Sequence, residues 1–236
     1  FKQRKMKKIY TLAALAMVAI VACNKLVEIT EENIPVDEPK KDVTIMATSA
    51  SETKTTVDGL QVKWSSGDHI AVFDADNDKH DFSLDDGAGT TTGKFSGSLS
   101  GKNSGGWAVY PFTTNAAFDG NEFHVDYATT YSYDAVTVPM YGSEGTGANA
   151  GKYEFEHVGG AFKIQYTNVP AGTDSFVFTS TGDDFMTGTA TFDLTDSAIS
   201  DGGKVVTVTN LPSSTSLTFI IPVPATATGT AYTFNV

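Results

Sequence analysis

From Val43 onward the chain alternates apolar and polar residues over short runs, and no stretch keeps the period of about 3.6 residues that marks an amphipathic helix. Clusters of Gly, Asn, Asp and Ser interrupt these runs about every 8–12 residues, a spacing typical of β-sandwiches. Because successive side chains of a strand point to opposite faces, each such run has one apolar face that can be buried. The pattern therefore predicts an all-β fold.

The clearest predicted hairpin lies in "GLQVKWSSGDHIAVF". Leu60, Val62 and Trp64 alternate with polar residues and form its first strand. In "SSGD", Gly67 can take the positive φ that a turn requires, and an apolar run then resumes at Ile70. Further strands are expected in "HDFSLDD", "GKFSGSL", "GWAVYPF", "EFHVDY", "KYEFEH", "AFKIQY", "SFVFTS", "GTATFDL", "KVVTVTNL", "SLTFIIPVP" and "AYTFNV".

Two consecutive sandwich domains are expected, an N-terminal domain at residues 43–158 and a C-terminal domain at 159–236. Gly159 and Gly160 separate two alternating runs, and a flexible pair of glycines suits a crossover from one sheet to another. Residues 159–236 are few for a complete sandwich, and the chain stops in a strand-like run. One interpretation is that the C-terminal domain is truncated.

A basic segment and a short apolar run open the chain. The basic segment is "KMKKIY", and we take Met6 within it as the true start. The apolar run that follows, "TLAALAMVAIVA", is too short to span a bilayer as a stable helix. This pattern predicts a signal peptide at residues 1–22. Residues 23–42 are charged and contain two prolines, which favours a flexible tether.

The apolar run ends at Cys23, the only cysteine of the chain. The tetrapeptide "IVAC" resembles the lipobox of bacterial lipoproteins. That resemblance implies cleavage between Ala22 and Cys23, diacylglycerol on the thiol, and an acyl chain such as palmitate on the new N-terminus. Each buried CH₂ contributes roughly 0.8 kcal/mol, so two or more chains make a stable anchor. The alternative is an ordinary secretory segment with an incidental cysteine.

Net charge and residue composition argue against several classes of partner and metal site. Acidic residues outnumber basic ones by 28 to 16, for a net charge of −12, and such a chain repels phosphate backbones; nucleic acid is therefore not expected as a partner. A single cysteine excludes an internal disulfide and a thiolate zinc cluster. The four histidines lack metal-ligand spacing and are His69, His80, His124 and His157.

The best candidate for a metal site is "DADNDKHDFSLDD". Asp74, Asp76 and Asp78 stand at positions 1, 3 and 5 of a possible calcium loop. Asp85 stands at position 12, but Lys79 occupies position 6, where the sharp turn needs glycine. A solvated turn of acidic residues is therefore favoured over a calcium site.

No motif for catalysis is found in the sequence. There is no G-x-S-x-G and no Ser/His/Asp set with a local signature, and lipid attachment would consume the only thiol. We therefore expect no enzymatic activity and no cofactor. Trp64, Trp107 and Tyr110 lie within strand-like runs, where core packing is favoured over a carbohydrate-binding platform.

After the lipobox come five segments, in this order: "TKTTVDGLQVKWSSGDHIAVF", "GAGTTTGKFSGSL", "WAVYP", "VPMYG" and "FEHVGGAFKIQY". Together these segments resemble the fimbrillin-like family, the type V pilus subunits and related surface lipoproteins of anaerobic Gram-negative bacteria. The resemblance covers roughly residues 43–236, and its most specific part is the W-S-x-G-D-x-I-x-V-F core.

The resemblance implies a fold and a function. The fold is a pair of transthyretin-like β-sandwiches without enzymatic activity, carried to the outer membrane as a lipoprotein and displayed on the cell surface or in a fimbrium. In that family a protease removes the N-terminal segment with the first strand, which opens a hydrophobic groove, and a C-terminal strand of another subunit fills this groove. The implied partners are other fimbrial subunits, outer-membrane lipid through Cys23, and host surface proteins or glycans.

The maturation site departs from the family pattern. The family usually has an arginine there, whereas Arg4 is the only arginine and precedes Met6. Lys40, Lys41 and Lys54 are the candidate substitutes for a trypsin-like protease.

The sequence thus predicts a lipid-anchored fimbrial subunit or fimbria-associated adhesin that assembles by strand addition. The alternative is a glycan-binding outer-membrane lipoprotein of a nutrient uptake system.

Overall fold

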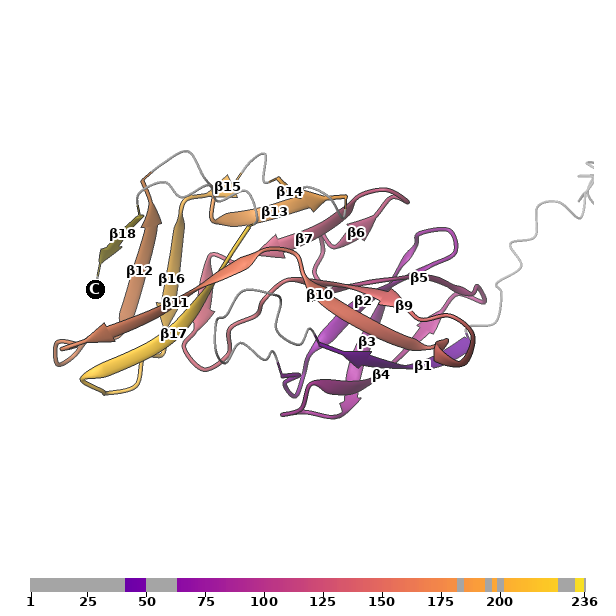
Figure 1. The fold of residues 1–236 in the computed structure, drawn as a ribbon, viewed down its shortest axis with the longest axis horizontal. Coiled ribbons are helices and arrows are strands. Elements are labelled where there is room, and N and C mark those ends of the chain that lie inside the picture. The colour runs from indigo at the N-terminus through magenta and orange to yellow at the C-terminus, as the bar shows by residue number, and fades with distance from the viewer. Residues whose placement is uncertain are drawn as a thin grey trace, which may run out of the picture. The chain divides into compact units, whose positions relative to one another are not determined.

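The structure is a computed structural model that describes residues 41–49, 63–181, 185–193, 197–198, 202–224 and 232–235. Within these ranges the protein is built from β-strands, and its one helical segment is a 3₁₀ turn, η2 (Gly147–Asn149). The predicted all-β class is confirmed (Figure 1). Among the described residues there is no helix of the length and apolarity needed to cross a bilayer.

Seven strands form a closed barrel in the N-terminal part of this structure (Figure 1). In the order of their pairing they are β1 (Lys41–Thr48), β10 (Lys152–His157), β9 (Met140–Glu144), β5 (Ser104–Tyr110), β2 (His69–Asp74), β3 (Lys79–Asp86) and β4 (Thr92–Leu99). The barrel closes because β4 pairs with β1. A closed sheet leaves fewer unpaired edges than an open one.

The barrel interior holds the first core cluster, which includes Trp64, Ile70, Phe82, Phe95 and Phe155. These side chains come from alternate positions of their strands or, for Trp64, from the segment before β2. We call this cluster the barrel core.

The remaining strands form three further sheets. One contains β11 (Gly160–Thr167) and β17 (Ser216–Val223). Another has the order β18 (Tyr232–Asn235), β12 (Ser175–Ser180), β16 (Val205–Thr209) and β8 (Thr130–Ser132). The last has the order β14 (Ser197–Ala198), β13 (Thr187–Phe192), β7 (Phe123–Tyr127) and β6 (Ala117–Phe118), with β15 (Gly202–Gly203) also paired to β13.

Two other clusters fill the space between these sheets. Phe176, Val206 and Phe219 belong to a core shared by β12, β16 and β17, which gives this part a sandwich character. Phe73 from β2 and Phe192 from β13 belong to the other cluster, so the outer face of the barrel strand β2 is also buried. This two-sided burial explains why β2 is apolar at successive positions.

Strand pairing crosses the domain boundary predicted at Val158. β7 and β8 precede this residue in the chain, yet β7 pairs with β13 and β8 pairs with β16. The division into 43–158 and 159–236 stays a prediction. Gly159 and Gly160 do lie where the chain passes from β10 of the barrel to β11 of another sheet, as expected of a crossover.

The predicted hairpin of residues 60–64 with the run from Ile70 is wrong in its described part. Residues 63–65 are not in a strand, and β2 pairs with β3 and β5 instead. The backbone of Trp64 bonds to the loop before β4, through Thr90 and Gly89. Local alternation predicted that this segment is buried on one side, but it could not predict the partner, because pairing depends on residues distant in the sequence.

Candidate functional site

The strand β1 closes the barrel, and its two halves differ in how many neighbouring strands pair with them. It pairs antiparallel with β4 over all eight residues, from Lys41 opposite Leu99 to Thr48 opposite Thr92. Its parallel pairing with β10 covers Met46 to Thr48 only. Among the described residues, the C-terminal half of β1 therefore has a strand on both sides, whereas the N-terminal half is paired on one side.

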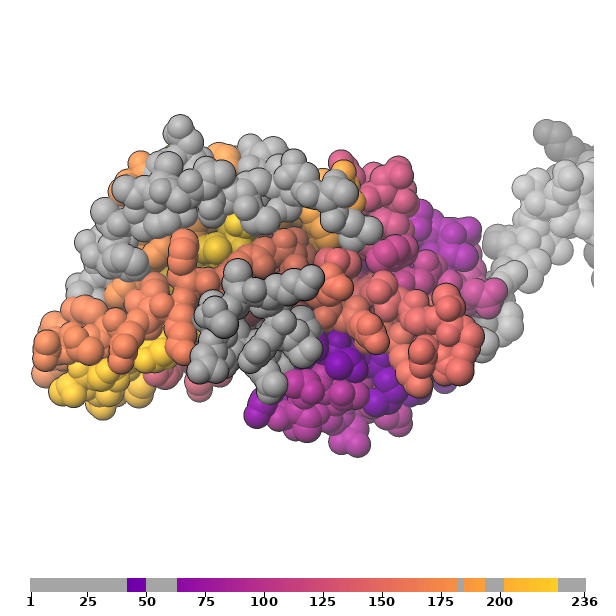
Figure 2. Space-filling model, in the orientation of Figure 1, coloured from indigo at the N-terminus to yellow at the C-terminus, as the bar shows by residue number. Residues whose placement is uncertain are grey.

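The side chains of β1 alternate between the core and the surface. Ile45 and Ala47 are buried in the barrel core and Val43 packs against it, whereas Met46 is 39% exposed. In the space-filling view the indigo atoms of β1 reach the surface between the magenta atoms of the β3–β4 region and the orange-red atoms of β10 (Figure 2). We call the place that β1 occupies, between β4 and β10 and over the barrel core, the β1 slot.

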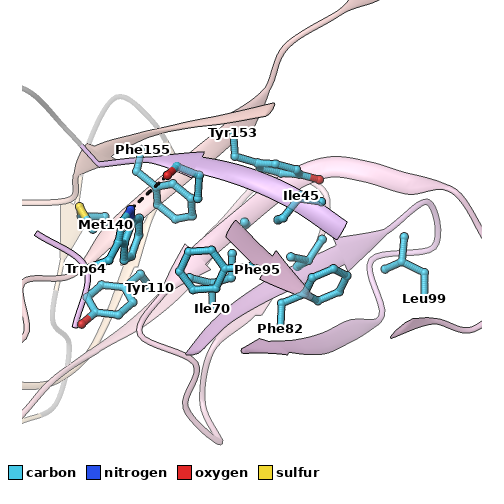
Figure 3. Close-up of a cluster of buried hydrophobic side chains, with 13 residues drawn as sticks. Ile45, Trp64, Ile70, Phe82, Phe95, Leu99, Tyr110, Met140, Tyr153 and Phe155 are labelled. Atoms are coloured by element: carbon cyan, nitrogen blue, oxygen red, sulfur yellow. Dashed lines mark hydrogen bonds between the residues drawn. The ribbon is translucent and has the colours of Figure 1, made fainter. Parts of the chain in front are cut away.

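Trp64 anchors the C-terminal end of β1 from inside the barrel. Its indole Nε1 donates hydrogen bonds to the carbonyl oxygens of Ala47 and Thr91, both at 3.1 Å. Figure 3 shows the first of these two bonds as a dashed line from Trp64. The indole ring is fully buried and makes edge contacts with Phe95 and Phe155, at centroid distances of 5.0 and 5.5 Å. A buried tryptophan needs a partner for its N–H, and here part of that partner is the backbone of β1.

Glycines of β4 make room for the rings beneath β1. Gly93 lies opposite Ala47, and a Cβ on this glycine would come within 2.9 Å of Trp64 and 2.8 Å of Phe95. Gly97 lies opposite Val43, and a Cβ there would come within 2.5 Å of Phe82. These rings, together with Leu84 and the backbone carbonyl of Asp81, thus occupy the volume that larger residues on β4 would need.

A pocket of about 110 Å³ opens beneath the N-terminal half of β1. Its apolar lining comes from Val43, Ile45, Val72, Phe82, Leu99 and Tyr153, and its polar rim from Lys102, Asn103, Ser104 and Glu144. At the rim the Tyr153 hydroxyl lies 2.5 Å from Ser104 Oγ and donates to Glu144 at 3.2 Å. Burial is the main cause that raises the pKa of Tyr153, so the phenol stays neutral.

The acidic turn predicted as a calcium candidate connects β2 to β3. Asp74 ends β2, is fully buried, and accepts hydrogen bonds from the amides of Asp76 and Asp78 at 2.9 and 3.0 Å. His80 Nε2 lies 2.9 Å from the other carboxylate oxygen. Burial by itself raises the pKa of Asp74, but the hydrogen bonds from His80 and the two amides, together with the charge of Lys102, leave this pKa below its ordinary value.

The ammonium group of Lys102 lies among the three carboxylates. Its Nζ is 2.5 Å from Asp76, 3.1 Å from Asp78 and 3.9 Å from Asp74. Hydrogen bonds to Asp76 and Asp78 raise the pKa of Lys102, so its charge is held. Asp85, the fourth predicted ligand, instead accepts a hydrogen bond from Ser96 on β4.

Within the described ranges, no group of three or more His, Cys, Asp or Glu residues is arranged to hold a metal ion. Sequence reasoning missed Lys102 because this residue lies in the loop between β4 and β5, far along the chain from the acidic turn, and no local pattern connects the two.

The acidic turn also positions the rim of the pocket. The amide of Ala75 donates to the carbonyl of Asn103 at 3.0 Å, next to the ion pairs of Lys102. Lys102, Asn103 and Ser104 all belong to the rim. The "DADND" segment therefore supports the loop that borders the β1 slot.

The W-S-x-G-D segment has a structural explanation in this fold. Asp68 accepts hydrogen bonds from the amide of Ser65 at 2.7 Å and from the hydroxyl of Tyr110 at 2.9 Å. This turn fixes the segment that begins with the buried Trp64. Core packing is confirmed for Trp64 and Tyr110, while Trp107 is half-buried against other aromatic rings.

Most of the residues predicted for lipid attachment and for cleavage lie outside the described residues. Ala22, Cys23, Lys40 and Lys54 lie outside the described residues, as does the predicted signal peptide of residues 1–22. Lys41 is the first residue of β1. The last two residues of the expected tether, Lys41 and Asp42, thus already belong to β1, where they pair with β4.

The histidines are not brought together by the fold. His80 contacts Asp74 and His69 lies 2.7 Å from Asp81, while His124 lies 3.4 Å from Thr191. His157 is partly buried, which lowers its pKa.

Comparison of this chain with protein-family models, with curated proteins and with solved structures finds no significant match.

Proposed function

We propose that this protein is a lipid-anchored fimbrial subunit or fimbria-associated adhesin, without catalytic activity, that assembles by β-strand addition. The observation that carries the proposal is the β1 slot, in which one N-terminal strand fills a gap between β4 and β10. The segments that resemble the fimbrillin-like family give independent support. The pair of transthyretin-like sandwiches expected from that resemblance is part of the same proposal.

The physics of the slot favours replacement of β1 over an empty slot. Without β1, both β4 and β10 have an unpaired edge, and the barrel core loses the cover of Ile45 and Ala47. Unpaired strand edges recruit other strands, and exposed apolar surface adds to the driving force. A strand from another subunit restores the hydrogen bonds and fills the same positions with alternate side chains.

Of the three candidate cleavage residues, Lys54 fits this role best. Cleavage after Lys40 or Lys41 leaves at least seven of the eight residues of β1 joined to the barrel, because the strand spans Lys41–Thr48. Cleavage after Lys54 separates the whole of β1 from the chain that follows. We therefore propose Lys54 as the maturation site.

The remaining parts of the proposal rest on the N-terminal segment and on the family resemblance. Cys23 carries the lipid, the outer membrane holds the protein, and host surface proteins or glycans are bound at the cell surface or on the fimbrium. The glycan-binding alternative relied on aromatic side chains facing solvent, and the burial of Trp64 and Tyr110 removes these two from such a platform.

Cleavage by a trypsin-like protease tests the function. We expect the purified protein to form ladders of oligomers on a gel after cleavage, and we expect Lys54→Gln to abolish the ladders. The matched control is the double variant Lys40→Gln with Lys41→Gln, which should polymerise normally because both sites precede most of β1. Intact mass identifies the bond that is cut. A cleaved protein that stays monomeric at every concentration would contradict the proposal.

A further inference from the structure

We propose that the β1 slot selects the incoming strand by the size of two side chains: a small residue at the position of Ala47 and an apolar residue larger than valine at the position of Val43. The occupant is an extended segment of another subunit, running antiparallel to β4 as β1 does. This inference rests on the strand-exchange function proposed above and adds the sequence pattern that the slot accepts.

The Ala47 end of the slot has no spare volume. Ala47 is fully buried, and Trp64 lies beneath it with the indole N–H bonded to its carbonyl oxygen. The facing residue on β4, Gly93, has no room for even a Cβ, because Leu84, Phe95 and Trp64 fill that space. Strands on both sides, β4 and β10, prevent β1 from moving away to accommodate a larger residue.

The Val43 end has unused volume. The pocket of about 110 Å³ is lined by Val43 and Ile45 from β1 and by Leu99, Phe82 and Tyr153 from the barrel. An engineered apolar cavity of about 150 Å³ in another protein binds benzene, so a volume of this size can accept additional side-chain carbons. The chain's own β1 leaves this space unfilled, and a strand with a larger side chain at this position gains the additional burial.

The register between β1 and β4 places the two selective positions four residues apart. Val43 lies opposite Gly97, Ile45 opposite Phe95 and Ala47 opposite Gly93. Inward side chains of a strand alternate, so the preferred segment reads large apolar, any, branched apolar, any, small. β1 itself, with Val43, Ile45 and Ala47, meets the last two conditions and falls short of the first.

Peptide binding to the full chain after cleavage at Lys54 tests the size rule. Four fluorescent peptides of residues 39–50 are compared by anisotropy: the unchanged sequence, Val43→Ile, Ala47→Val and, as a control for added apolar surface, Thr44→Val on the exposed face. We expect Val43→Ile to bind roughly fourfold tighter, because one more methylene is buried. Ala47→Val should bind about tenfold weaker from overpacking, and Thr44→Val should stay within about twofold of the unchanged peptide.

The outcomes separate the size rule from the proposed function. If none of the four peptides binds, strand exchange itself is contradicted. If all four bind alike, or if Ala47→Val binds as tightly as Val43→Ile, the size rule is overturned while strand exchange stands. The same substitutions in the full chain give a second measurement by urea unfolding. Val43→Ile should keep or raise the unfolding midpoint, and Ala47→Val should lower it; the reverse order would contradict the rule.

Discussion

At the residue scale, two fully buried side chains hold the surrounding chain in place through hydrogen bonds. Trp64 bonds to the backbone of β1 at Ala47 and to the loop at Thr91. Asp74 collects hydrogen bonds from its own turn and from His80. Both groups are fully buried, so a lost partner leaves a polar atom without compensation, which costs about 1–3 kcal/mol.

Substitution of Asp74 tests the acidic turn. We expect Asp74→Asn to lower the free energy of unfolding at pH 7 by about 1–3 kcal/mol, because the buried carboxylate accepts charge-assisted hydrogen bonds. Asp76→Asn is the matched control: it makes the same change on a side chain that is 65% exposed, and its effect should be small.

The difference in free energy of unfolding between wild type and Asp74→Asn should depend on pH, and the pKa of Asp74 sets the direction. The folded pKa lies below the ordinary value of 3.8, so the stabilisation is complete above about pH 4 and is lost as the pH falls through the folded pKa. Urea unfolding at pH 7, 5, 4 and 3 measures this difference in free energy of unfolding. We expect it to stay constant at the higher pH values and to become smaller only at the lowest pH. A difference in free energy of unfolding that grows as the pH falls would contradict a lowered pKa for Asp74.

At the element scale, the unequal attachment of β1 is the main feature. Eight residues pair with β4 but three with β10, and the β1 residues that line the pocket, Val43 and Ile45, precede those three. The strand is thus best held where Trp64 bonds to it. This unequal pairing is consistent with the proposal that β1 leaves the barrel during assembly.

A disulfide between β1 and β4 tests whether β1 must leave. Thr44 and Ser96 face each other on the outer surface, with their hydroxyl oxygens 3.3 Å apart. In a Cys23→Ser background, the pair Thr44→Cys and Ser96→Cys should crosslink when oxidised, because directly opposed residues have suitable Cβ separations. We expect the oxidised protein to form no ladders after protease treatment and the reduced protein to form them.

Two observations complete that test. Each single cysteine variant should form ladders under both redox conditions, which controls for the substitutions themselves. Ladders of equal extent from the oxidised double variant, with the crosslink verified by mass, would show that polymerisation does not require release of β1.

At the scale of the whole molecule, the strands do not follow the order of the chain in forming sheets. β7 and β8 pair with strands from the C-terminal part, and Phe73 and Phe192 share one cluster although they are far apart in sequence. The barrel that carries the β1 slot is therefore buttressed on the outer face of β2 by the sheet of β7 and β13.

The proposed anchor belongs to this scale as well. In a Gram-negative host, we expect the full-length protein to partition into the detergent phase of a Triton X-114 extraction, because acyl chains on Cys23 make it amphiphilic. Intact mass should show cleavage between Ala22 and Cys23 plus the acyl groups. Cys23→Ser should move the protein to the aqueous phase. Wild-type protein found in the aqueous phase with an unmodified thiol would rule out the anchor.

The sequence by itself determined the fold class and the places of most strands. Runs such as "KYEFEH" and "SFVFTS" match β10 and β12, and Pro111 directly follows β5, because strand periodicity and turn residues act over a few neighbouring positions. The acidic turn was also predicted as a turn, since Lys79 stands where a calcium loop needs glycine.

Only the tertiary structure decided which strands pair and what fills the spaces between them. The antiparallel and parallel partners of β1, the bond from Trp64 to Ala47, the ion pairs of Lys102 and the pocket beside Val43 all join residues far apart in the chain. Local alternation shows that a strand has an apolar face but not which neighbour covers it. That choice depends on the packing of all side chains at once, and the β1 slot is a product of that packing.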